Sequence, residues 1–153
     1  MRVQRSKVTT VTPDLLAAAT LSVETDGEGF YEITCEVQQF ARDTGAEQGI
    51  VLLYLRHTSA SLVIQENADR DVRTDLRTAL ARLAPLDAGW IHETEGPDDM
   101  PAHVKTMLTG ISLHIPVTKG VLALGTWQGI YLVEHRARPH PREIVLHFIG
   151  RSR

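Results

Sequence analysis

Apolar residues recur at helical spacing in one long segment, which predicts an amphipathic helix over residues 68–83. Residues of this segment that lie four, four and three positions apart would share one face of the helix. Asn67 is expected to cap its N-terminus. The apolar face is formed by Val72, Leu76, Leu80 and Leu83.

Two shorter helices are expected over residues 35–42 and 101–108; Asp98 or Asp99 can cap the second, and Gly110 can end it. The uninterrupted apolar run at residues 50–55 predicts a central strand covered on both faces. Segments 21–24 and 30–34 flank a turn-like Asp-Gly-Glu-Gly and predict a hairpin. Strands are expected at 4–11, 21–24, 30–34, 50–55, 111–117, 129–135 and 143–149, with a short apolar stretch at 121–124.

Many strands with two or three helices predict an α+β fold, a large mixed or antiparallel β-sheet sandwich with helices to one side. The 153 residues are a usual length for one domain. No linker or repeat divides them, and 42% hydrophobic residues are enough for a core. We therefore expect a single domain over residues 1–153.

Charge and composition exclude several classes of protein. With 16 Lys and Arg against 19 Asp and Glu, the chain has no general basic character, so no nucleic-acid partner is expected. No apolar run approaches the ~20 residues of a membrane helix, and the N-terminal stretch lacks the apolar core of a signal peptide. Cys35 is the single cysteine, which excludes an intrachain disulfide and fits a cytoplasmic location. Nothing in the sequence indicates a role for Cys35.

Seven histidines invite an acid–base or metal interpretation, although they form no standard motif. His57 ends the central strand beside the hydroxyls of Thr58 and Ser59, where an imidazole could act as acid or base. It could equally bond only to the backbone.

His92 lies in an acidic segment upstream of Asp99, and imidazole with carboxylate suits a divalent metal. A solvated acidic loop is the simpler alternative. His103 is expected in the first turn of its helix, where free N–H groups attract anions. Lys105 lies ~200° further around a helix of 3.6 residues per turn, so it should face elsewhere, for example a neighbouring subunit.

Several other polar residues are candidates for ligand binding. Asp71 and Asp75 share a helix face, and their mutual repulsion suggests a cationic partner or an ordinary ion-pair network. Trp127 could form the wall of a pocket or a buried strand junction. Arg142 belongs to the one locally basic segment, which could hold an anion or be a solvated loop.

Taken together, these motifs resemble the YjbQ family, also described as secondary thiamine-phosphate synthases. The resemblance covers nearly the whole chain and is densest from His57 to His135. Residues 12–29 match poorly, and the arginine-rich loop 136–142 replaces a segment in which relatives often carry glycine. The motifs are His57-Thr58-Ser59-Ala60-Ser61-Leu62, Glu66-Asn67-Ala68-Asp69, Glu95-Gly96-Pro97-Asp98-Asp99-Met100-Pro101-Ala102-His103-Val104-Lys105 and Gly125-Thr126-Trp127-Gln128-Gly129-Ile130.

The resemblance implies an α+β fold with a large mixed sheet, a homotrimer with sites near subunit boundaries, and a weak thiamine-phosphate synthase activity. In that reaction a thiazole phosphate attacks an aminopyrimidine diphosphate and diphosphate leaves, which a divalent metal, Mg²⁺ or Zn²⁺, would assist. We expect His57 and His103 to be catalytic, and His92, His103 and Asp99 to hold the metal. The expected substrate-binding residues are Glu66, Asn67, Asp75, Lys105, Thr126, Trp127, Gln128 and Arg142.

Two other functions remain open at this point. The chain could be a metal- or anion-binding trimer that acts on, or senses, another phosphorylated or heterocyclic metabolite. It could also be a structural protein whose polar clusters only hold the trimer together, although the concentration of His, carboxylate and Gly-Thr-Trp-Gln segments disfavours this. The sequence has no glycine-rich phosphate loop that would decide between the first two.

Overall fold

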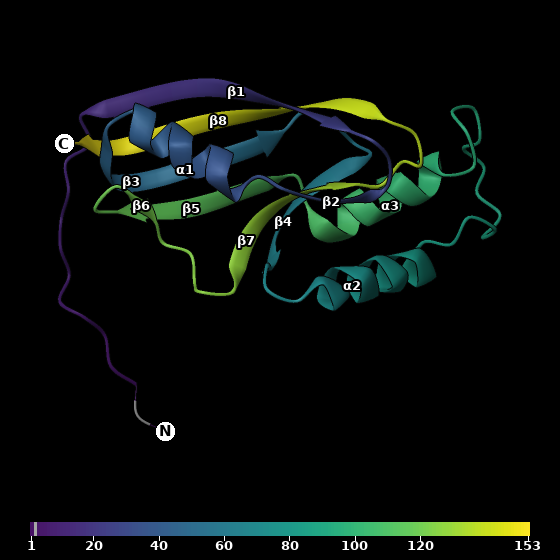
Figure 1. Ribbon diagram of the computed structural model, residues 1–153, viewed down its shortest axis with the longest axis horizontal. Helices are drawn as coiled ribbons and strands as arrows, with labels where there is room; N and C mark the ends of the chain where they lie inside the picture. Colours follow the sequence, from purple (N-terminus) through teal and green to yellow (C-terminus); the bar gives the residue numbers. More distant parts are fainter. Residues whose placement is uncertain (2) are drawn as a thin grey trace.

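A computed structural model describes residue 1 and residues 3–153. It contains three helices and two β-sheets (Figure 1). In chain order the elements are β1 (Leu15–Thr25), β2 (Gly29–Glu32), α1 (Thr34–Asp43), β3 (Ala46–Leu55), β4 (Ala60–Glu66), α2 (Arg70–Leu83), α3 (Asp99–Thr109), β5 (Ser112–Thr118), β6 (Val121–Leu122), β7 (Gln128–Glu134) and β8 (His140–Ser152).

The larger sheet has the strand order β1-β8-β3-β5-β6, and the smaller has the order β2-β7-β4. Every strand pair among the described residues is antiparallel. The sheets share one hydrophobic core, to which α1 contributes Val37 and Ala41. Helices α2 and α3 lie beside the smaller sheet, away from β1 and β8 (Figure 1). The α+β architecture expected from the sequence is confirmed.

Alternation along β3 decides which face of the larger sheet is buried. Val51, Leu53 and Leu55 are fully buried in the core. Ile50 and Tyr54 point the other way and keep 47% and 46% of their surface exposed. The strand is central, as expected. The expectation that both of its faces are covered is wrong within a single chain, because its outer face is exposed. No helix among the described residues packs on that outer face, because α1 joins the core and α2 and α3 lie beside the smaller sheet.

Two expectations near the N-terminus are also wrong. Residues 4–11 form no strand; the first strand begins at Leu15 and pairs over its whole length with β8. The expected hairpin does not form either, because β1 pairs with β8 and β2 pairs with β7. The Asp26–Gly29 turn therefore carries the chain from one sheet to the other. A long antiparallel partner outweighs a locally favourable turn.

The starts of α2 and α3 differ from expectation by a few residues. The carboxylate of Asp69 accepts the Asp71 N–H at 2.8 Å and caps α2, so Asp69 replaces Asn67 in that role. Helix α3 begins at Asp99, two residues early, and ends at Gly110 as expected. His103 therefore lies in the second turn, on the same face as Asp99 four residues before it. No helix in the described part of the chain is long and apolar enough to cross a membrane.

A buried histidine links β7 to β4 within the smaller sheet. His135 follows β7 and is 3% exposed, and its Nε2 shares a hydrogen bond of 2.9 Å with the Ser61 hydroxyl of β4. Burial and the nearby Lys105 ammonium lower the pKa of His135 to about 4. The folded protein therefore keeps this imidazole neutral under conditions in which an unfolded chain would protonate it.

This difference predicts a pH-dependent stability. Between pH 4 and 6.5 the unfolded chain binds a proton that folded His135 does not, so the free energy of unfolding falls as the pH is lowered. His135 should contribute up to ~1.4 kcal/mol per pH unit to this slope. Urea unfolding should show a shallower slope for His135→Gln and an unchanged slope for His114→Gln, which alters an exposed histidine. Equal slopes in the wild type and His135→Gln would contradict the assignment.

Candidate functional site

Three of the residues proposed from the sequence converge at the start of α3. One side-chain donor atom from each of His92, Asp99 and His103 lies within 4.8 Å of the other two. Asp99 is buried, whereas the side chains of His92 and His103 are 44% and 32% exposed. The carboxylate therefore forms the buried part of the group, and the two imidazole rings form its solvent-exposed part.

Both carboxylate oxygens of Asp99 are engaged. Oδ1 accepts a hydrogen bond from the Arg136 guanidinium. Oδ2 lies 2.8 Å from Nε2 of His92 and 3.3 Å from Nε2 of His103. Arg136 is itself fixed by the Glu95 carbonyl at 2.7 Å and the Asp98 carboxylate at 3.2 Å. One oxygen of Asp99 is thus held by a cation, and the other faces both histidines.

The orientation of His103 determines which of its nitrogens carries hydrogen. Nδ1 lies 2.8 Å from the Thr58 carbonyl oxygen, which can only accept a hydrogen bond. Nδ1 must therefore donate, and a neutral His103 then presents a lone pair at Nε2. That lone pair faces the Asp99 oxygen at 3.3 Å. Two acceptors this close repel each other unless a proton or a metal ion lies between them.

The spacing of Asp99 and His103 fits two ligands of a small divalent ion. Zinc ligands lie at ~2.0–2.1 Å, so two ligands of a tetrahedral site are ~3.3 Å apart, and this matches the separation of Asp99 and His103. Metal-binding histidines commonly donate their second N–H to a backbone carbonyl, as His103 does to Thr58. Two imidazoles and one carboxylate leave a fourth position open, on the exposed side.

A hollow of about 440 Å³ adjoins this group and is walled by the loop before α3. Trp90 borders it, with the indole N–H donating to the Pro85 carbonyl at 2.8 Å, which holds the ring in place. Trp90 was not among the expected site residues, although its position two residues before His92 was a usable signal. The lining residues are Leu86, Asp87, Gly89, Trp90, His92, Glu93 and Pro97.

His57 does not join the other two histidines. Its Nε2 accepts the backbone N–H of Glu143 at 2.9 Å, so the ring binds β8. Burial and the neighbouring Arg142 guanidinium lower the pKa of His57. Its neighbour Thr58 is the residue that touches the candidate metal group, through the carbonyl described above. Within one chain, His57 is therefore not part of the candidate metal group, and this group gives no support to its expected catalytic role.

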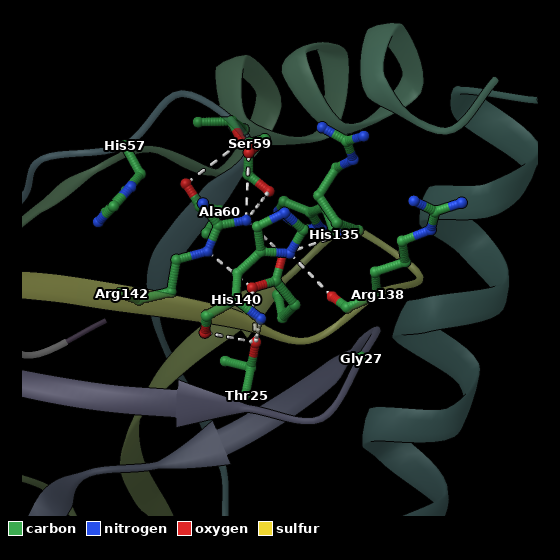
Figure 2. A network of polar contacts seen from close by, with 12 residues as sticks. Thr25, Gly27, His57, Ser59, Ala60, His135, Arg138, His140 and Arg142 are labelled. Carbon is green, nitrogen blue, oxygen red and sulfur yellow. Dashed lines mark hydrogen bonds and ion pairs between the residues drawn. The ribbon is translucent and has the colours of Figure 1, made fainter. Parts of the chain in front are cut away.

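The two basic residues expected to bind substrate are used inside the fold. Arg142 is buried and makes paired hydrogen bonds to Glu134 at 2.7 and 2.6 Å. Its guanidinium also donates to the Ser59 hydroxyl, and both residues are labelled in Figure 2. Burial would raise the pKa of Glu134, but hydrogen bonds from Arg142 and from the backbone of Arg136 lower it. Lys105 is also buried and meets Glu28 of the same chain at 2.6 Å, not a neighbouring subunit.

The other expected substrate residues lie at the far end of the smaller sheet. Glu66 pairs with Gln128, whereas Ala60, beside α3, pairs with Glu134. These positions are six residues apart along the strand, or ~20 Å at ~3.3 Å per residue. Within one chain, this second group is therefore remote from the histidines, and Asp75 is exposed on α2. The remote residues are Glu66, Asn67, Thr126, Trp127 and Gln128.

Comparisons with known proteins agree on one family. The model of the family described as "UPF0047 protein YjbQ-like" matches residues 19–151. A UPF0047 protein of Synechocystis is 48% identical over 85% of this chain and 89% of its own. The UPF0047 protein YjbQ of Salmonella typhimurium is 42% identical over 82% of this chain and 92% of its own.

Solved structures give the same result. A YjbQ/UPF0047 family protein of Clostridium acetobutylicum superposes with a TM-score of 0.80 and is 34% identical, over 85% of this chain and 98% of that one. A hypothetical protein of Aeropyrum pernix has a TM-score of 0.81 at 26% identity, over 88% of this chain and 99% of that one. With matches that extend through both sheets and the histidine group, this chain belongs to the UPF0047 YjbQ-like family.

Proposed function

We propose that His92, Asp99 and His103 bind one divalent metal ion, through which the protein acts on a phosphorylated small molecule. The observation that carries this proposal is the placement of His103, whose Nδ1 is bound to the Thr58 carbonyl and whose Nε2 lies 3.3 Å from the Asp99 carboxylate. Two imidazole nitrogens favour Zn²⁺ over Mg²⁺, which prefers oxygen ligands. The buried Arg136 guanidinium donates to Asp99 and so orients the carboxylate for this role.

The reaction implied by family resemblance is thiamine-phosphate synthesis. The thiazole nitrogen forms a bond to the pyrimidine methylene carbon, and the carbon–oxygen bond to diphosphate breaks. A bound divalent cation supplies charge neutralisation for the leaving diphosphate. The hollow beside Trp90 is suited to a flat ring, since an indole held in place offers a stacking face. The same features would serve another phosphorylated or heterocyclic metabolite, which remains the alternative.

A homotrimer would complete the site. In one chain the histidines are remote from Glu66, Asn67, Thr126, Trp127 and Gln128, which we call the Trp127 group. A neighbouring subunit would therefore have to supply the ring-stacking and polar contacts of this group. Two surfaces support association. No residue of α2 is buried, although the helix carries an apolar stripe, and the outer face of the larger sheet exposes Ile50, Tyr54 and Ile149. Apolar surface of this kind is typical of subunit interfaces.

The metal proposal predicts a stoichiometry. Protein purified without a histidine tag should contain about one zinc per chain by plasma mass spectrometry, and His103→Ala should retain less than a tenth of it. His114→Ala, which removes an exposed histidine of β5, should bind as the wild type does. Equal metal content in His103→Ala and the wild type would exclude His103 as a ligand.

The reaction is tested separately. Thiamine-phosphate formation should be detectable with protein from a host that lacks its own synthase, assayed with Zn²⁺ and with Mg²⁺. His103→Ala should lower turnover at least tenfold at an unchanged melting temperature. A wild-type protein that binds metal but makes no product would move the function to the alternative metabolite.

The assembly is tested by its mass. Light scattering should give about 51 kDa, three times the 17.0 kDa chain. We expect a trimer because isolated subunits would leave the apolar surfaces of α2 and of the larger sheet exposed to water. A monomeric mass at micromolar concentration would contradict the trimer and leave the Trp127 group without a role at the histidines.

A further inference from the structure

One face of α2 concentrates positive charge in a chain whose net charge is negative. Arg70, Arg73 and Arg77 lie three and four residues apart, so they share one side of the helix. Asp71 and Asp75 fall on another side, about 100–140° away from Arg70 at 3.6 residues per turn. The helix thus offers no carboxylate three or four residues away from Arg77.

These arginines line a hollow of about 220 Å³ between α2 and β2. Thr74 lies between them on the helix, and Gly29 and Phe30 form the opposite wall. A Cβ atom added to Gly29 would meet only the Tyr31 ring, at 3.6 Å. The space beside the Gly29 Cα atom is therefore not filled by other backbone atoms.

The central arginine is held in place and the outer two are not neutralised. Nη1 of Arg73 donates to the Glu66 carbonyl at 3.1 Å and to the Tyr131 hydroxyl at 3.3 Å, and its guanidinium lies over the Tyr131 ring. In the part of the chain that the structure describes, neither Arg70 nor Arg77 forms an ion pair. Three arginines therefore line one hollow, and none of them forms an ion pair within the described residues.

The acidic residues that flank the β2 wall of this hollow already have partners. Glu28 is bound to Lys105 of α3 at 2.6 Å. Glu32 accepts hydrogen bonds from the hydroxyls of Thr34 and Tyr131. An anion from outside the chain would offset the repulsion among the arginines.

We propose that the hollow between β2 and α2 binds a phosphate group through Arg70, Arg73 and Arg77. Guanidinium groups present forked N–H donors that match phosphate oxygens, and three of them suit a dianion better than a carboxylate. The small volume favours a single phosphate over a polyanion, and the adjoining Phe30 ring gives an apolar contact for the organic part of a monoester. This site shares no residue with the histidine group and does not depend on a metal.

The test is titration of the ¹⁵N-labelled protein at fixed ionic strength, followed by amide NMR shifts. Inorganic phosphate should give saturable shifts for Gly29, Phe30 and the first two turns of α2. The double variant Arg70→Gln/Arg77→Gln should bind at least tenfold more weakly, with an unchanged melting temperature because neither side chain has an ion pair to lose. The matched control Arg82→Gln, on the acidic side of α2, should bind as the wild type does.

Phenyl phosphate distinguishes the two sources of the phosphate group. Tighter binding of phenyl phosphate than of inorganic phosphate supports a monoester that contacts Phe30, and equal affinities support free phosphate. Shifts that never saturate, or an equal loss of affinity in Arg82→Gln, would overturn the site, since either would reflect general electrostatic attraction. Saturable binding confined to single-stranded RNA would also overturn it.

Discussion

The buried carboxylate of Asp99 is the constraint on which the rest of the site depends. A lone ionised group in the interior is strongly destabilising, so it must be paired. Arg136, two residues after β7, supplies the pair and also binds Asp98 and the Glu95 carbonyl. The start of α3, the acidic loop and the turn between β7 and β8 are thereby held together. Removal of one partner from such a pair costs ~3–5 kcal/mol, because the other charge is left buried.

Patterns of apolar spacing and of turn residues, which involve only neighbouring positions in the sequence, predicted much of the fold. The helix at 70–83, the short helix at 34–43 and the last three long strands follow from spacing and from turn residues. The misplaced first strand and the false hairpin have a common cause. Residues 4–11 and the Asp26–Gly29 turn have suitable local chemistry, but β1 finds its partner in β8, more than a hundred residues away. Periodicity carries no information on such pairings.

The site was predicted in part, for a similar reason. His92, Asp99 and His103 lie within twelve positions of the sequence, and one helix turn joins two of them, so their meeting is a local consequence of α3. Arg136 and the Thr58 carbonyl come from other elements, and only tertiary structure shows that they orient the donors. Arg142 and Lys105 look like substrate ligands in sequence, because burial against Glu134 and Glu28 leaves no local trace.

The most direct test of the central claim is the ¹⁵N NMR spectrum of the imidazole rings during zinc titration. The geometry requires His103 to carry its hydrogen on Nδ1, where Thr58 accepts it, and to bind the ion through Nε2. The account predicts an Nδ1–H tautomer for His103 and zinc-dependent shifts of Nε2 in His92 and His103, with the ring of His57 unchanged. A hydrogen on Nε2 of His103 in the zinc-loaded protein, or shifts spread over all seven histidines, would contradict it.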